Sequence, residues 1–244
     1  MKDKLFTLPN TLTLANLACG CVATVCALSP DAGRGAHDAF FWFIAAAAVF
    51  DLLDGAAARL TGSYSEIGKQ LDSLADMVSF GVAPSAALFA IYSGAGAMWG
   101  GTPELYHALR WTMFAVALFA ALRLARFNVD DTQREEFTGL PSPAAGLAIA
   151  ALCTMGDGSL FFPREVCLAV AVVASLLMVS PVRMFSLKFK NFGWRENRLR
   201  YVFLASSVVF VALLGIGGIA AAIGLYAAIG LVRHLTEKRT VEKI

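Results

Sequence analysis

The sequence predicts an all-α integral membrane protein with about eight transmembrane helices, and its composition, its apolar stretches and its charge pattern support this fold class. Of the 244 residues, 58% are hydrophobic and 16% are charged, and the mean hydropathy is +0.66. Soluble domains carry about 25% charged residues. The net charge of +2 is too small to indicate nucleic-acid binding, so no nucleic-acid partner is expected.

Eight apolar stretches follow one another along the chain, each near the roughly 20 residues that a helix needs to cross the hydrocarbon of a membrane. Polar residues from Pro9 to Asn16, around the start of the first stretch, argue for a retained helix over a cleaved signal peptide. Only a Gly-rich junction separates the last two stretches, so seven or nine spans are alternatives. The expected spans are 12–30, 38–60, 70–94, 106–128, 141–157, 163–182, 199–215 and 217–234.

The basic residues are distributed unevenly between the two ends of these spans. If the N-terminus is inside, all of the 20 lysines and arginines except Arg34, Arg110 and Arg164 lie at inner ends. The positive-inside rule describes this asymmetry. It predicts that both termini face the cytoplasm, in what we expect to be a prokaryotic plasma membrane. No segment is long enough for a separate soluble domain, so residues 1–244 are expected to form one membrane-embedded domain.

Four aspartates lie where the second span ends and the third begins. Asp51 and Asp54 occupy the last turns of the second span, and Asp72 and Asp76 occupy the first turns of the third. Spacings of three and four residues place each pair on one helix face. The short connection predicts that the two helices are antiparallel neighbours whose acids meet at the cytoplasmic edge. Acids inside a membrane are costly and mark a functional site.

Divalent cations are the simplest means of holding four carboxylates together. Hard oxygen ligands suit Mg²⁺ and Mn²⁺. Asp51 and Asp54 also lie near helix C-terminal carbonyls, which disfavour anions unless a cation is present. Two divalent ions would balance four carboxylates, and a pair of metals can clamp a phosphoryl group during displacement. The sequence therefore predicts two Mg²⁺ or Mn²⁺ ions per site.

Two other interpretations of the acids are open. Arg59 and Lys69 could form interfacial ion pairs with them, although two cations cannot neutralise four acids. A cation transporter or proton relay would place its acids nearer the membrane midplane. The small residues Gly55, Ala58 and Gly68 permit either tight helix packing or the approach of a flat ligand.

The pattern Asp-x2-Asp-Gly-x2-Ala-Arg-x8-Gly-x3-Asp-x3-Asp over residues 51–76 resembles the signature of the CDP-alcohol phosphatidyltransferases at all eight fixed positions. The resemblance implies a six-helix catalytic core, usually dimeric, in which a CDP-linked lipid donates its phosphatidyl group to an alcohol and CMP leaves. It places the core at roughly 8–182, with an additional helical pair at roughly 199–234. A homodimer is therefore expected, in contact with membrane lipids.

The same resemblance implies roles for particular residues. Asp51, Asp54, Asp72 and Asp76 are the implied metal ligands, and Asp76 is also the implied general base. The implied nucleotide site comprises Asn10, Thr13, Asp51, Gly55, Ala58, Arg59 and Gly68.

Four further strings resemble the members of this family that accept serine. They lie at 9–16, 72–84, 123–128 and 139–143. They imply CDP-diacylglycerol and L-serine as substrates. Glycerol 3-phosphate or an inositol phosphate is the alternative acceptor.

Six residues are candidates for binding serine or phosphate: Ser79, Arg123, Arg126, Asn128, Lys188 and Lys190. Arg123 and Arg126 could anchor a helix end at the interface, or grip a phosphate or carboxylate with two hydrogen bonds. Ser79 could bind the acceptor or its own helix backbone. The two lysines could contact lipid headgroups or neutralise a substrate phosphate.

Overall fold

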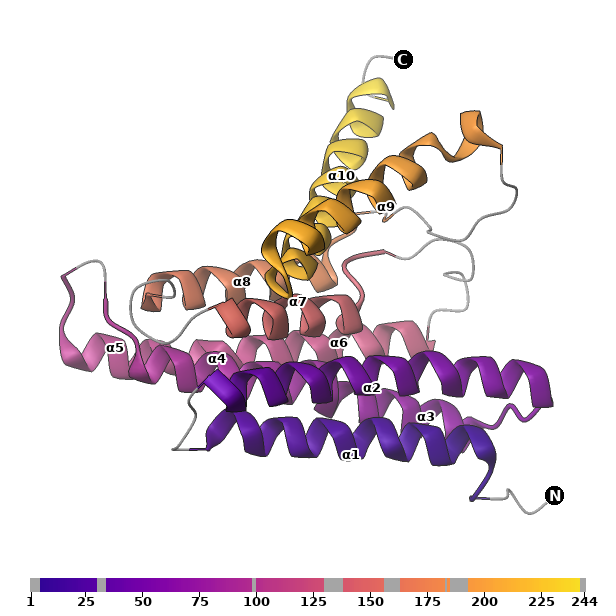
Figure 1. Ribbon diagram of the computed structural model, residues 1–244, viewed down its shortest axis with the longest axis horizontal. Coiled ribbons are helices and arrows are strands. Elements are labelled where there is room, and N and C mark those ends of the chain that lie inside the picture. The colour runs from indigo at the N-terminus through magenta and orange to yellow at the C-terminus, as the bar shows by residue number, and fades with distance from the viewer. Residues whose placement is uncertain are drawn as a thin grey trace.

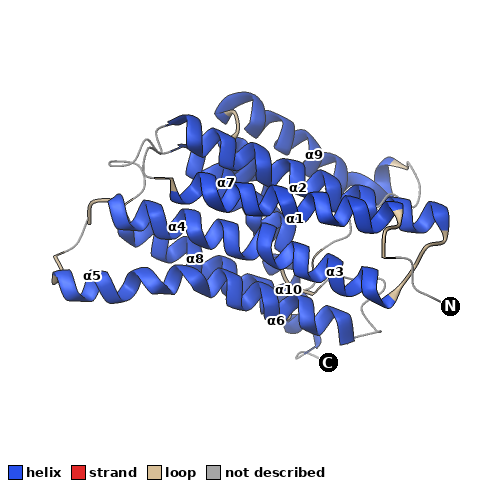
Figure 2. Cartoon of the chain, turned by 90° about the horizontal axis from the view of Figure 1, so that it is seen from below, coloured by secondary structure: helices blue, strands red, loops and turns tan. Residues whose placement is uncertain are grey.

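A computed structural model describes residues 5–29, 34–97, 100–129, 138–155, 163–182, 184 and 193–241. Helices account for almost all of this described part, and no strand occurs in it (Figure 2). The elements are α1 (Leu8–Leu28), α2 (Arg34–Thr61), α3 (Glu66–Asp76), the π-helical segment η1 (Met77–Val82), α4 (Ala83–Gly94), α5 (Pro103–Leu109), the 3₁₀ segment η2 (Arg110–Phe114), α6 (Ala115–Val129), α7 (Ser142–Met155), α8 (Arg164–Val179), α9 (Trp194–Leu214) and α10 (Gly217–Val241).

Each of the eight expected spans corresponds to a helix or to a continuous helical run. The third span is α3, η1 and α4 end to end, and the fourth is α5, η2 and α6. Six of the runs in the described part are long and apolar enough to cross a membrane, and α7 is a shorter apolar helix. The prediction of an all-α integral membrane protein is confirmed.

The helices from α1 to α8 form a bundle with roughly parallel axes, whereas α9 and α10 leave it at an angle (Figure 1). The start of α1 and the α2–α3 connection lie at one end of the bundle, and α5 lies at the other. Large apolar side chains such as Phe40, Ile44, Phe80 and Leu88 fill the interior and are almost fully buried. α10 packs against α7 as well as α9, which joins the C-terminal pair to the bundle.

The second and third spans make few direct contacts with each other, among them those of α2 with η1, and each packs more closely against α1. α1 packs extensively against α2 and also against α3 and η1, whereas α2 and α3 make almost no contact with each other. Ala23 and Ala27 of α1 are buried in the core. Small side chains let helix backbones approach closely, and this allows α1 to pack against both helices that carry the acids.

The third span contains a π-helical segment directly after Asp76. π-segments are rare and occur frequently at functional sites. Ser79 and Phe80 of η1 are fully buried, and the Ser79 hydroxyl donates to the backbone oxygen of Asn16 in α1 at 3.0 Å. Gly20 makes this approach possible, because a Cβ there would lie 2.8 Å from the Cα of Ser79.

Replacing Gly20 with alanine is therefore expected to destabilise the protein by about 1–3 kcal/mol, the usual cost of overpacking. The new methyl group would meet the backbone of Ser79, which cannot rotate away as a flexible side chain can. Thermal unfolding of the purified protein measures the effect. Gly94→Ala is the matched control, because a Cβ at Gly94 has no neighbour within 4 Å. Equal unfolding temperatures for the two variants would contradict this packing.

Candidate active site

Three of the four aspartates converge from α2 and α3. Carboxylate oxygens of Asp51, Asp72 and Asp76 all lie within 4.8 Å of one another. Asp76 is 6% exposed, and the Oδ1 atom of Asp72 is buried without a hydrogen-bond partner. A buried carboxylate that lacks partners is costly. The convergence that the spacing predicts is present for these three acids, although their helices pack more closely against α1 than against each other.

The basic neighbours of the acids do not neutralise them. Within the described ranges no ion pair joins Arg59 or Lys69 to any of the four aspartates. Lys69 instead donates to the backbone oxygen of Asn128 at 2.7 Å. The cluster therefore consists of hard oxygen donors that neither Arg59 nor Lys69 neutralises, which is the donor chemistry of a divalent metal site.

Asp54 lies beside this group but is not one of its three members. It is 6% exposed, and the Thr13 hydroxyl donates to its Oδ2 atom at 2.6 Å. Asp54 and Asp72 both line a neighbouring cavity, so the fourth acid faces the space next to the other three.

α1 contributes a second contact to the acids, one turn beyond Thr13. The Asn16 side chain is fully buried, and its Nδ2 donates to Oδ1 of Asp76 at 3.1 Å. The Asn16 Oδ1 atom is buried and has no partner. Neither the helical spacing of the acids nor the eight-residue signature predicts a role for Asn16. The available signal was the i, i+3 spacing of Thr13 and Asn16, two polar side chains on one face of an apolar helix.

A cavity of about 580 Å³ opens next to Asp54, between α1, α2 and α3. Its wall includes every residue expected at the nucleotide site except Asp51: Asn10, Thr13, Gly55, Ala58, Arg59 and Gly68. A Cβ at Gly55 would approach only Arg59, at 3.5 Å, whereas a Cβ at Gly68 would lie 3.0 Å from Oδ1 of Asn10. Gly55 thus borders open space, which favours ligand approach, and Gly68 serves close packing.

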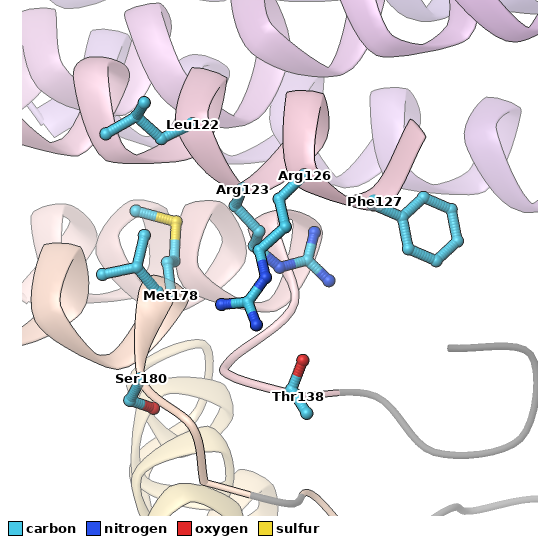
Figure 3. Close-up of a pocket in the computed structure, with 8 residues that line it drawn as sticks. Leu122, Arg123, Arg126, Phe127, Thr138, Met178 and Ser180 are labelled. Carbon is cyan, nitrogen blue, oxygen red and sulfur yellow. The ribbon is translucent and has the colours of Figure 1, made fainter. Parts of the chain in front are cut away.

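Arg123 and Arg126 line a second cavity, of about 270 Å³, together with Thr138, Met178 and Ser180. Both arginine side chains extend from α6 toward the chain around Thr138 and the end of α8 (Figure 3). Arg126 is exposed, and its guanidinium has no hydrogen-bond partner in the part of the chain that the structure describes.

Arg123 connects this cavity to the acidic cluster. It is largely buried and lies near enough to Asp76 for electrostatic attraction. Its Nη1 donates to the Ser142 hydroxyl at 3.1 Å, while its Nε is buried without a partner. Asp72 of the acidic cluster and the neighbouring Asp54 thus line the first cavity, and Arg123, which lines the second, is attracted to Asp76 of the cluster.

The other acceptor candidates occupy different surroundings. Ser79 is fully buried, bonds to the backbone of α1 and lines neither of these two cavities. Asn128 donates to the Ser73 hydroxyl at 2.8 Å and thereby ties α6 to α3. Lys188 and Lys190 lie outside the described residues.

Comparisons with known proteins agree with this geometry. A family model described as CDP-alcohol phosphatidyltransferase matches residues 6–181. A CDP-diacylglycerol–serine O-phosphatidyltransferase of Helicobacter pylori is 32% identical over 242 residues, covering 96% of this chain and 93% of the relative. A protein of the same name from Methanocaldococcus jannaschii is 29% identical, with 95% and 96% covered. An archaetidylserine synthase of Methanothermobacter thermautotrophicus is 33% identical over 188 residues, with 75% and 72% covered.

The matched region contains the acids, both cavities and every helix from α1 to α8. The family that residues 51–76 indicate is thus confirmed over most of the chain. This protein belongs to the CDP-alcohol phosphatidyltransferase family.

Proposed function

We propose that the protein transfers the phosphatidyl group of CDP-diacylglycerol to L-serine, forming phosphatidylserine and CMP. The observation that carries this proposal is the acidic cluster beside a cavity suited to a nucleoside diphosphate, with a second cavity that contains two arginines, one of them attracted to Asp76. The names of the relatives from Helicobacter pylori and Methanothermobacter thermautotrophicus support serine as the acceptor.

The donor fits the larger cavity. Its volume of about 580 Å³ accommodates a nucleotide, and Gly55 and Ala58 leave room for a flat base against α2. Arg59 and Lys69 line the same cavity and supply positive charge for the diphosphate. Asn10 and Thr13 offer polar contacts from α1.

The four aspartates are the ligands for two Mg²⁺ or Mn²⁺ ions in this proposal. When bound, such ions neutralise the diphosphate and stabilise the charge that develops on its oxygens. Asp51, Asp72 and Asp76 already lie together, and Asp54 faces the nucleotide cavity beside them. The unpartnered Asp72 Oδ1 supports a cation at this position.

The acceptor fits the smaller cavity. The serine carboxylate pairs with the Arg126 guanidinium, and Arg123 directs the acceptor toward Asp76. Asp76 takes the proton of the serine hydroxyl, whose oxygen attacks the lipid-linked phosphorus as the bond to the CMP oxygen breaks. Asn16 holds the Asp76 carboxylate in a fixed orientation through its 3.1 Å hydrogen bond. Holding both substrates side by side supplies much of the acceleration.

An acceptor panel tests this function. Purified protein receives CDP-diacylglycerol, Mg²⁺ or Mn²⁺, and serine, glycerol 3-phosphate or an inositol phosphate in turn, and CMP release is measured. We expect release that depends on serine. Release with one of the phosphorylated alcohols alone would assign the protein another acceptor. No release with any alcohol would contradict phosphatidyl transfer and favour ion binding or transport.

Replacing Arg126 with glutamine is expected to raise the KM for serine by about tenfold or more, because a charge-assisted hydrogen bond contributes about 1.5–3 kcal/mol. The KM for CDP-diacylglycerol should stay unchanged, because Arg126 does not line the nucleotide cavity. Arg198→Gln is the matched control, because it removes the same charge from an exposed position on α9. An unchanged KM for serine in the Arg126 variant would contradict this acceptor site.

We propose further that the acidic end of the bundle faces the cytoplasm of a prokaryotic plasma membrane and that the protein is a homodimer with one catalytic domain per chain. The concentration of basic residues at the acidic end supports the orientation. Gly224 of α10 is exposed with open space around it, and Ala220 lies four residues before it. Such a small-residue pair suits close contact with a helix of a second copy.

A further inference from the structure

A third cavity lies at the end of the bundle opposite the acids and takes no part in the proposed reaction. Its volume is about 320 Å³, and it lies where α4 ends, α5 and η2 begin the fourth span, and α8 starts. Arg110 and Arg164 line it with Tyr92, Tyr106 and His107. These two arginines are among the three basic residues that break the charge asymmetry of the sequence. They are far apart in the chain, and the fold brings both to the wall of this cavity.

Arg164 is held in a fixed position, and its terminal N–H groups have no acceptor among the described residues. Its Nε donates to the backbone oxygen of Tyr92 at 3.2 Å, and its guanidinium carbon lies 4.8 Å from the ring centre of Tyr106. Its own backbone N–H donates to the oxygen of Gly96 at 3.1 Å.

Arg110 presents a second guanidinium, whose contacts among the described residues are with aromatic rings. Its guanidinium carbon lies 5.0 Å from the ring centre of Trp111 and 5.5 Å from that of Phe89. Its Nε is buried and has no hydrogen-bond acceptor. Cation–π contacts orient a guanidinium but leave its N–H donors unused. Two oriented guanidinium groups with free donors match the oxygens of a phosphate, which Arg binds through paired hydrogen bonds.

The surroundings of the cavity indicate where the phosphate comes from. Trp111 is 57% exposed and Leu105 is 50% exposed, both on elements that form the cavity wall. Exposed apolar and aromatic side chains at the end of a membrane-spanning run lie at the level of lipid headgroups. Glu104 and Glu165 belong to the same end of the bundle, but neither lines the cavity. We propose that this cavity binds the phosphate group of an anionic lipid in the leaflet opposite the active site.

Native mass spectrometry of the full-length protein, titrated with phosphatidylglycerol, tests the proposal. We expect the wild-type protein to retain the lipid, and the double variant Arg110→Gln/Arg164→Gln to bind it about tenfold or more weakly. Arg110→Lys keeps the positive charge but loses the planar guanidinium group, so its affinity for the lipid should lie between those of the wild type and the double variant. Arg198→Gln removes an equal charge from α9 and should bind as the wild type does. Turnover of CDP-diacylglycerol by the double variant should be unchanged, which shows that it is folded.

The outcomes are distinct. Equal lipid retention by the wild type, the double variant and Arg198→Gln would overturn the site. Displacement of the lipid by millimolar inorganic phosphate would overturn the assignment to a lipid headgroup. If the double variant does not assemble, Arg110→Gln alone decides the question, because the Arg110 side chain makes only ring contacts in the described structure.

Discussion

Replacing Asp76 with asparagine is expected to lower kcat by a factor of about 10² to 10⁴, the usual contribution of a general base. Asparagine has nearly the same shape, so the hydrogen bond from Asn16 can persist. The amide cannot accept the proton of the serine hydroxyl, and it removes one negative charge from the acidic cluster. Serine-dependent CMP release by the purified variant measures the effect.

Asp38→Asn is the matched control for this variant. Asp38 is an acid on α2, near its start and outside the acidic cluster. We expect its kcat to equal that of the wild-type protein, and both variants should unfold at the wild-type temperature. Near-normal turnover by the Asp76 variant would remove this residue as the base.

Chelation of divalent ions with EDTA is expected to abolish turnover altogether. The acids that face the diphosphate would then repel it, and no cation would offset the charge on the departing CMP. Excess Mg²⁺ or Mn²⁺ should restore activity. The helical circular-dichroism signal should not change, because the bundle is held by apolar packing that does not involve the acids. Turnover that continues in EDTA would contradict a metal-dependent reaction.

The helices were predictable from the sequence because membrane burial requires long apolar stretches, and hydropathy detects these directly. Which helices pack against one another was harder to predict from the sequence. The four residues that link α2 to α3 suggested direct contact, since short connections usually join neighbours. In the structure both helices pack more closely against α1 than against each other, because Gly20 and Ala23 allow the α1 backbone to approach closely. The hydropathy pattern also does not indicate the π-helical segment after Asp76.

The convergence of Asp51, Asp72 and Asp76 could be predicted because helical spacing alone places each pair of acids on one face. The role of α1 in holding them could not. Asn16 contacts Asp76 across 60 residues of sequence, and no local pattern reports a contact at that separation. The cavity around Arg126 likewise depends on Thr138 and Ser180, which come from other segments of the chain.

The binding of Mn²⁺ to the purified protein, followed by electron paramagnetic resonance, tests most directly whether the aspartates of α2 and α3 form a metal site. We expect two ions per chain for the wild-type protein and the same for Asp38→Asn. Asp72→Asn should bind at least one ion about tenfold more weakly, because it loses a buried carboxylate oxygen that has no other partner. An absence of saturable Mn²⁺ binding, or identical binding by the Asp72 variant, would contradict a metal site at these helix ends.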